Sequence, residues 1–284
     1  MSAFEITPIG AVRSGYRACD EIPPGGGAAQ LEIFEPFAEG LLGIELSSHL
    51  IVVGLFHQAD RSRLTARPKR ADPEAAPRGV FGTRSPARPN PLGVTVVPLL
   101  RREGLRLFVD HLDMLDGTPI VDLKSYSPGW DSVFCATRER RARASVLEPA
   151  LLASLLERGL ENHLGKAAAH SPEARLGLAA VFVAVRYFGV DARDPALSVT
   201  SNRCDASTDA LLGTMGASFS ECRLHIRPEE GPLTLRFEYE GCALVLRSRK
   251  NGVAAEPGRW AESFEAKVEA NAPSSEERDE KPAA

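Results

Sequence analysis

Two arginines in a proline-rich stretch are best placed, by type and spacing, to hold an anionic ligand. Arg84 and Arg88 lie within Gly79–Thr95, beside Asn90 and three prolines at positions 86, 89 and 91. Because proline fixes its own φ and disfavours helix at the preceding residue, this segment has few free torsions. A stiff loop that presents guanidinium and amide groups suits a ligand with anionic or polar edges. A solvated surface turn explains the same composition equally well.

A second stretch, Leu112–Tyr126, combines carboxylates with a lysine and a tyrosine. Asp116-Gly117 is a strong turn signal, and Asp113 and Asp122 lie on either side of it. Lys124 and Tyr126 follow at the spacing that places strand residues on one face. Closely spaced carboxylates suit a sugar diol, a cation or a proton, although turn chemistry alone explains any single aspartate.

Two smaller features adjoin predicted strands. The loop Pro23-Pro24-Gly25-Gly26-Gly27 leaves backbone N–H groups open to a ligand, although most glycine runs are only turns. His57 and Gln58 follow the apolar run Leu50–Phe56, which reads as a buried strand. Polar residues at the end of a buried strand are well placed to line a pocket, although a lone histidine there is more often structural.

The elements that must position these residues are short strands separated by turns. Their spacing predicts a small all-β barrel or sandwich over residues 1–145, with residues 61–78 as a loop. The predicted strands are 4–13, 30–34, 50–56, 95–100 and 105–112, and residues 36–42 read as a short helical turn.

The second half of the chain has a different pattern. Helical spacing at 146–159 and 171–188, with the Ser171-Pro172 start signal, precedes a predicted helix at 205–212 that Gly213 ends. Alternating strands follow at 223–227, 233–239 and 243–248, so we expect an α+β domain over residues 146–250. The polar residues 251–284 are predicted to be a disordered tail.

Composition is that of an ordinary soluble protein. The 284 residues are 43% hydrophobic and 25% charged, which suggests two domains, and no apolar run reaches the ~18 residues of a membrane span. No signal peptide is visible, and five scattered cysteines argue for a reducing compartment. We therefore expect a cytoplasmic protein.

The charge is distributed unevenly along the chain. The net charge of −4 argues against a broad nucleic-acid-binding face, yet residues 61–145 hold 16 basic and 9 acidic residues. A positive middle segment suits a polyanion, and chance clustering of loop arginines explains it as well.

Four motifs resemble the TsaA/TrmO family, also called YaeB-like or UPF0066. They occur in the family's order and at its spacing, and the resemblance covers roughly residues 4–130. The motifs are Ile9–Ser14, Ser48–Leu50 with Phe56–Gln58, Arg78–Gly93 and Leu115–Tyr126. The resemblance implies a small β-barrel that binds S-adenosylmethionine (SAM) and methylates N6 of threonylcarbamoyladenosine beside the tRNA anticodon. It further implies a homodimer whose cofactor lies near the contact between the two protomers.

The resemblance also assigns roles to residues. The family's glycine-rich loop contacts the cofactor, Arg84 would meet its carboxylate, and residues near Val94 and Asp110–Asp113 would hold the adenosine end. The implied cofactor-binding residues are Pro24, Gly26, Gly27, His57, Gln58, Arg84, Val94, Asp110, His111, Leu112 and Asp113. This chain has Pro23-Pro24-Gly25-Gly26 where the family usually has Pro-Arg-Gln-Gly, so one arginine and one glutamine are missing from the loop.

Methyl transfer needs a nucleophile held in line with the sulfonium. The acceptor nitrogen is amide-like, so loss of its proton should help, yet no His–Asp or Cys–His pair marks a base. The candidates for orienting the acceptor or taking its proton are Asp116, Asp122, Lys124 and Tyr126.

The second half faintly resembles the FmdE-like domains of formylmethanofuran dehydrogenase, which carry a His and Cys metal cluster. His163, His170, Cys204 and Cys222 could supply soft ligands, but their spacing is stretched, so we expect a degenerate domain without metal. Two other functions stay open beside tRNA methylation: SAM-dependent methylation of another nucleoside or small metabolite, and non-catalytic sensing of SAM or a metal.

Overall fold

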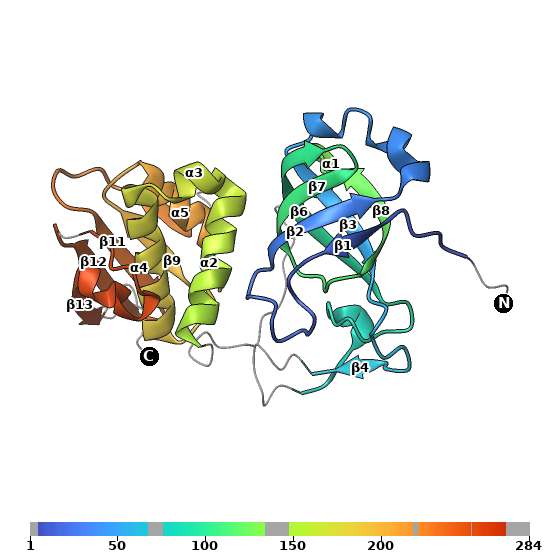
Figure 1. The fold of residues 1–284 in the computed structure, drawn as a ribbon. Helices are drawn as coiled ribbons and strands as arrows, with labels where there is room; N and C mark the ends of the chain where they lie inside the picture. Colours follow the sequence, from blue (N-terminus) through green and yellow to red (C-terminus); the bar gives the residue numbers. More distant parts are fainter. Residues whose placement is uncertain (1–4, 68–75, 134–147, 218–220, 251, 271–284) are drawn as a thin grey trace, which may run out of the picture. The chain divides into compact units, whose positions relative to one another are not determined.

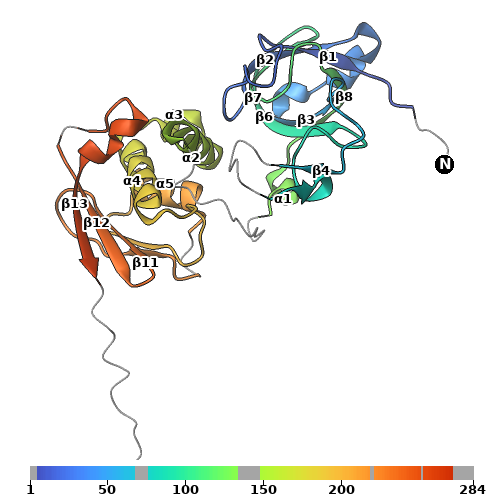
Figure 2. The ribbon, with the colours of Figure 1, turned by 90° about the horizontal axis from the view of Figure 1, so that it is seen from below.

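The computed structural model describes residues 5–67, 76–133, 148–217, 221–250 and 252–270. The chain divides into two compact units, residues 1–138 and 139–284, each shown in Figures 1 and 2. From the sequence, we predicted this domain boundary after residue 145. Both positions fall within 134–147, which lie outside the described residues.

The first unit is a closed six-stranded barrel, as the sequence predicted. Its strands follow one another around the barrel in the order β1-β2-β7-β6-β3-β8, and every neighbouring pair is antiparallel. The strands are β1 (Gly10–Arg13), β2 (Gly27–Ile33), β3 (His49–Leu55), β6 (Leu92–Glu103), β7 (Arg106–Leu112) and β8 (Pro119–Ser125). Closure leaves the barrel with no free sheet edge.

Alternation of side chains builds the barrel interior. In β2 and β3, every second residue is buried, because successive strand residues point to opposite faces. Leu31, Leu50, Val52, Val97 and Leu107 are completely buried in one apolar cluster. The interior is therefore packed with side chains, and ligand-binding groups must come from the strand ends and the loops.

Antiparallel pairing sorts the strand ends into two rims. We call one end of the barrel the first rim. It contains the ends of β1, β3 and β7 and the starts of β2, β6 and β8. The connections described at this rim are residues 14–26, 56–67, 76–91 and 113–118. The opposite strand ends form the second rim, which carries the short helices η1 (Glu35–Leu41), η2 (Ile44–Leu46) and α1 (Pro128–Asp131).

Several local predictions differ from the structure. The strand expected at 95–100 extends over twelve residues as β6, and the loop 61–78 contains the short strand β4 (Thr65–Ala66) and the start of its partner β5 (Arg78–Gly79). Val80 then begins the single turn η3 (Val80–Gly82), in which its side chain is completely buried. The buried Val80 also joins the segments of this connection, because its N–H donates to the Leu64 carbonyl at 3.0 Å.

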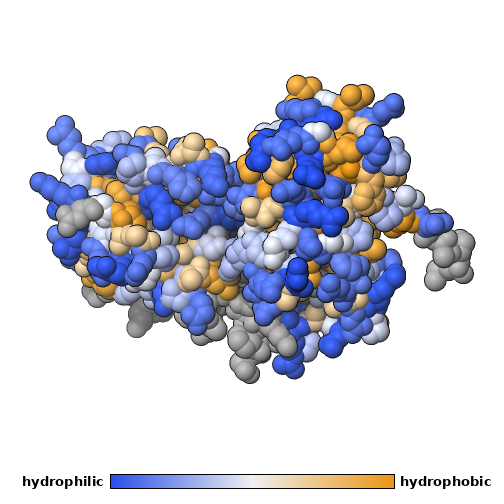
Figure 3. Space-filling view, viewed as in Figure 1, coloured by the Kyte–Doolittle hydropathy of each residue, from blue (hydrophilic) through white to orange (hydrophobic). Residues whose placement is uncertain are grey.

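The second rim exposes apolar side chains. Leu42 and Leu46 are 81% and 93% exposed beside η1 and η2, and Trp130 on α1 is 89% exposed. Figure 3 shows apolar surface among hydrophilic residues on the barrel.

The second unit is α+β, as predicted. Its sheet has the order β10-β9-β11-β12-β13, and its helices cover one sheet face (Figure 2). The helices are α2 (Pro149–Leu164), α3 (Lys166–Ala169), α4 (Pro172–Phe188) and α5 (Ala206–Met215), and the strands are β9 (Ser198–Ser201), β10 (Leu224–Ile226), β11 (Thr234–Tyr239), β12 (Cys242–Ser248) and β13 (Phe264–Ala270). Ser171 caps α4 by accepting from the Ala174 N–H at 3.2 Å.

Two expectations for this unit were wrong in detail. The helix predicted to end at Gly213 continues to Met215, where Gly216 with φ +58° ends it. Gly213 instead lies against α2, since a Cβ there would stand 2.7 Å from the Cβ of His163. The expected tail also begins later than predicted, because the helix η5 (Pro257–Ser263) and β13 fold onto the sheet, where β13 pairs with β12 and Trp260 is completely buried. Residues 271–284 lie outside the described residues.

Within the described ranges, no helix is long and apolar enough to cross a bilayer.

Candidate functional site

The glycine-rich loop packs directly on the end of β7 at the first rim. Gly26 has φ +86°, and a Cβ on it would stand 2.4 Å from the carbonyl carbon and oxygen of His111. Glycine is therefore required at this position for two reasons: the backbone is left-handed, and there is no room for a Cβ. The sequence predicted that this loop leaves backbone N–H groups open to a ligand, and the structure shows in addition that it packs against the segment Asp110–Asp113.

That segment has an unusual backbone. His111 has φ +58°, which is uncommon for a residue with a side chain, and its N–H donates to Asp110 Oδ1 at 2.8 Å. Two residues later, Asp113 Oδ1 accepts from the buried hydroxyl of Thr95 at 2.5 Å. These bonds fix both carboxylates at the first rim. The sequence did not single out Thr95, because only the barrel register shows that it faces Asp113.

Arg84 reaches the same rim from the proline-rich loop. Its Nη2 donates to the carbonyl oxygen of Val94 at 2.5 Å, which joins two residues that were predicted as a pair of cofactor contacts. The rest of its guanidinium makes no recorded bond within the described ranges, and the side chain is exposed. Arg84 is thus held by one donor while its other donors face solvent.

The remaining predicted cofactor contacts also lie at this rim. Pro24 is exposed in the β1–β2 loop, and Gly27 begins β2 opposite Leu112. His57 and Gln58 are exposed just beyond β3, with Nε2 of each 3.4 Å apart. The structure therefore brings all eleven predicted cofactor-binding residues to one end of the barrel, although the roles assigned to them stay predictions.

Three glycines of the barrel strands face inward at this rim, and a loop side chain occupies the space beside each of them. A Cβ on Gly27 would meet the Tyr16 hydroxyl at 2.2 Å, and one on Gly93 would meet the Phe56 ring at 2.2 Å. A Cβ on Gly54, which pairs with Gly93, would meet the Met114 sulfur at 2.6 Å. Since the mouth is filled, a ligand at this rim would lie against the loops outside the barrel interior.

The four candidate catalytic residues do not share one place. Asp116 belongs to the first rim, where its Oδ1 accepts from the Ser14 N–H at 3.1 Å and its own N–H donates to Tyr16 O at 2.8 Å. Tyr126 lies at the second rim, where its hydroxyl is 2.6 Å from that of Ser132. The seven residues of β8 separate the two rims by about 20 Å at the usual rise per strand residue.

Asp122 and Lys124 lie between those two positions on β8. They form an exposed ion pair at 2.7 Å, and they line a groove of about 510 Å³ toward the second rim together with Phe37 and Leu41. Of the four candidates, Asp116 is the one that lies in a loop of the first rim. Asp122 of β8 lies in the same cross-strand row as the predicted cofactor residue Val94, because Val53 of β3 pairs with both. The Tyr126 ring lies 6.4 Å from that of His49.

The soft-ligand candidates of the second unit are dispersed. No group of three or more His, Cys, Asp or Glu side chains that could hold a metal ion occurs in the described part of the chain. His170 Nδ1 is 2.7 Å from the carbonyl oxygen of Lys166, and Cys204 and Cys222 are exposed free thiols.

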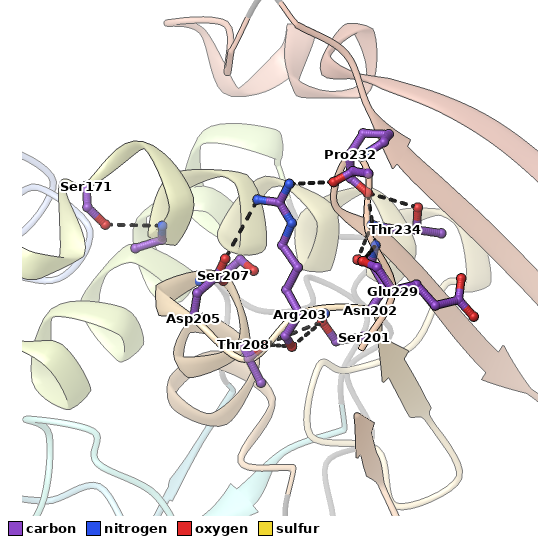
Figure 4. Close-up of polar contacts among 12 residues, drawn as sticks. Ser171, Ser201, Asn202, Arg203, Asp205, Ser207, Thr208, Glu229, Pro232 and Thr234 are labelled. Atoms are coloured by element: carbon purple, nitrogen blue, oxygen red, sulfur yellow. Dashed lines mark hydrogen bonds and ion pairs between the residues drawn. The ribbon is translucent and has the colours of Figure 1, made fainter. Parts of the chain in front are cut away.

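The loop around Cys204 is a hydrogen-bonded turn, shown in Figure 4. The Arg203 carbonyl accepts from the hydroxyls of Ser201 and Thr208, and Asp205 caps α5 by accepting from the Ser207 N–H at 2.9 Å. Arg203 Nη2 donates to the Gly231 carbonyl at 2.6 Å. These contacts account for the polar residues of the loop without a ligand.

Comparisons with known proteins match the barrel. The model of the tRNA-methyltransferase O N-terminal domain matches residues 11–132. The tRNA (adenine(37)-N6)-methyltransferase of Escherichia coli is 35% identical over 164 residues, which cover 53% of this chain and 69% of that protein. A probable S-adenosyl-L-methionine-binding protein of Archaeoglobus fulgidus is 43% identical over 137 residues, and the match covers 47% of this chain and 37% of that protein.

Among solved structures, TrmO from Pseudomonas aeruginosa is 34% identical with a TM-score of 0.41, and the match covers 50% of this chain and 64% of that one. The chain thus spans from about a third to two thirds of these proteins. The extent and identity of the Escherichia coli match, together with the domain model, place the barrel among its relatives: the chain belongs to the tRNA-methyltransferase O N-terminal domain family.

Proposed function

We propose that this protein is a SAM-dependent methyltransferase that acts on tRNA, at N6 of the adenine beside the anticodon. The observation that carries the proposal is the arrangement of the first rim, where three loops distant in sequence meet the barrel strands. The backbone of Gly26 packs against His111, Arg84 donates to the Val94 carbonyl, and Asp113 accepts from the Thr95 hydroxyl. The names of the relatives from Archaeoglobus fulgidus and Escherichia coli support SAM as the ligand and tRNA adenine as the acceptor.

The residues of the first rim fit the chemistry of SAM. The open donors of Arg84 suit the amino-acid carboxylate, since a guanidinium fork binds carboxylates well. Asp110 and Asp113 supply acceptors for the ribose diol, and the glycine-rich loop allows the ligand to approach the backbone closely. When bound, SAM supplies an electrophilic methyl group on a sulfonium centre.

The protein's contribution to the reaction would be positioning. Holding the acceptor nitrogen in line with the methyl group supplies several kcal/mol of the barrier, up to ~7–11 kcal/mol in favourable intramolecular models. Asp116 is the candidate catalytic residue in a loop of this rim, and its carboxylate could accept a proton from the nitrogen or orient its N–H through Oδ2, which makes no recorded bond within the described ranges.

The finer proposal is that the acceptor is threonylcarbamoyladenosine. Its N6 is part of a carbamoyl group, so the nitrogen is weakly nucleophilic and gains most from deprotonation. The exposed arginines of the β3–β6 connection, among them Arg63 and Arg67, would contact tRNA phosphates.

The test is methylation of tRNA by the full chain. Purified protein is incubated with SAM and tRNA containing threonylcarbamoyladenosine, and the digested nucleosides are analysed by mass spectrometry. We expect one added methyl group on that nucleoside and tRNA binding that weakens steeply with salt, because phosphate contacts release counterions. Tight SAM binding without methyl gain on any tRNA nucleoside would contradict the proposal and favour a sensor or a metabolite enzyme.

A further inference from the structure

Arg88 belongs to the same loop as Arg84, but its guanidinium turns into the loop. Its Nε donates to the Ser85 carbonyl at 2.9 Å, and its Nη2 donates to the carbonyls of Val80 at 2.7 Å and Thr83 at 2.6 Å. The side chain is half-buried, whereas Arg84 is exposed. The two arginines therefore have different roles: Arg88 binds carbonyls of its own loop, and Arg84 is exposed at the first rim.

The prolines explain why the carbonyls of Thr83 and Ser85 need a side-chain donor, whereas the Val80 carbonyl also accepts from the N–H and the hydroxyl of Thr83, at 3.3 and 3.2 Å. Pro86, Pro89 and Pro91 have no N–H group, so they remove three backbone donors from a short segment. Buried carbonyls that lose a backbone partner must be satisfied by a side chain or water. A guanidinium carries five N–H donors in a fixed plane, and one such group can serve several carbonyls at once.

The carbonyls that Arg88 holds bracket Arg84. Thr83 and Ser85 are its two chain neighbours, and the Val80 side chain is completely buried. The direction of the Arg84 side chain depends on the backbone torsions between those two carbonyls. Arg88 thus fixes the backbone from which Arg84 reaches Val94.

We propose that Arg88 is a positioning residue that acts through Arg84, holding its guanidinium at the first rim for an anionic carboxylate. The inference rests on the proposed function in one respect, namely that Arg84 meets the carboxylate of SAM. Lysine cannot replace Arg88, because its donors radiate from a single nitrogen and do not match the separated positions of Nε and Nη2.

The experiment is a double-mutant cycle read by SAM affinity in calorimetry. We expect Arg88→Ala and Arg88→Lys each to weaken SAM binding about tenfold. In the Arg84→Ala background, Arg88→Ala should weaken binding by less than about twofold more, because the effects of residues that act as one unit are not additive. The matched control is Arg61→Ala, because Arg61 Nε donates to the Pro89 carbonyl of the same loop at 3.1 Å but holds neither neighbour of Arg84.

A second readout needs no ligand. Arg88→Lys should speed amide hydrogen exchange at residues 83–85 in the free protein, while the melting temperature of the barrel stays close to that of the wild type and Arg61→Ala changes neither. Additive losses in the cycle would show that Arg88 binds the ligand itself and would overturn the proposal. Unchanged amide exchange at residues 83–85 in Arg88→Lys would also overturn the proposal, and this readout does not require that the protein binds SAM. Absence of SAM binding by the wild type would contradict the proposed function alone.

Discussion

The backbone of Gly26 lies so close to that of His111 that a Cβ on the glycine would stand 2.4 Å from the His111 carbonyl. This contact joins the β1–β2 loop to the end of β7, and both residues have positive φ, +86° and +58°. Gly26 adopts its positive φ without steric cost. His111 carries a side chain, so its positive φ is costly unless the surroundings hold it, and such strain gathers at functional sites.

Gly26→Ala is therefore expected to disrupt the first rim. A side chain at positive φ costs roughly 1–3 kcal/mol before the clash with His111 is counted. SAM affinity in calorimetry should fall at least tenfold. Gly15→Ala in the same loop is the matched control, because no heavy atom lies within 4 Å of its Cβ position. Equal SAM affinity in the two variants would show that the loop does not form the site.

Arg84→Ala should weaken SAM binding about ten- to hundredfold, because a hydrogen bond to a charged group contributes about 1.5–3 kcal/mol. Folding should be unaffected, since the side chain is exposed and makes one recorded bond, to Val94. Arg63→Ala, which removes an exposed arginine paired with Asp60 in the same connection, serves as the control. A loss of the same size in the control would point to general electrostatics.

Asp116→Asn should slow methyl transfer while SAM affinity stays within about twofold. Asparagine can still accept from the Ser14 N–H, which the wild-type carboxylate accepts at 3.1 Å, so the turn persists and only the charge is lost. Single-turnover rates at saturating SAM separate the two effects. Full activity of the variant would remove Asp116 from the reaction.

Gly93→Ala should destabilise the barrel by about 1–3 kcal/mol, the usual cost of overpacking. Its new methyl group would meet the Phe56 ring at 2.2 Å, whereas Gly82→Ala meets nothing within 4 Å. Phe56→Leu in the Gly93→Ala background should recover part of the loss. Urea unfolding measures all four proteins, and equal stability of the two alanine variants would contradict the packing described for this rim.

His49 predicts a pH dependence of stability. Partial burial lowers the pKa of its imidazole below the ordinary ~6.5, with a smaller contribution from the charge of His111. Because the folded pKa lies below the unfolded one, the unfolded chain binds more protons. The stabilisation is complete above about pH 6.5 and declines as the pH falls through the folded pKa. His49→Gln should flatten this decline in unfolding experiments from pH 7.5 to 5, and an unchanged slope would exclude His49 as its source.

Local pattern predicted much of the fold correctly. The apolar run at 50–56 became β3, and the Ser171-Pro172 signal marked the start of α4, because burial and capping act within a few residues. The end of α5 was missed, since Gly213 serves helix packing rather than termination. The strand β13 was missed because residues 251–284 were assigned by their polar composition, although apolar and charged residues alternate along Phe264–Ala270 as in a strand.

The site was harder to predict in one respect. Asp116 and Tyr126 are ten residues apart, and that short separation suggested a shared site. An extended strand lies between them, so the barrel places them at opposite rims. Only the strand register shows this, and the same register reveals the partnership of Thr95 with Asp113.

The most direct test of the proposed site is a crystal structure of the full chain with SAM bound. We expect density at the first rim, with the carboxylate on Arg84 and the nucleoside beside Gly26 and Asp113. Density in the groove beside Asp122 and Lys124, or on the second unit, would contradict the proposed site.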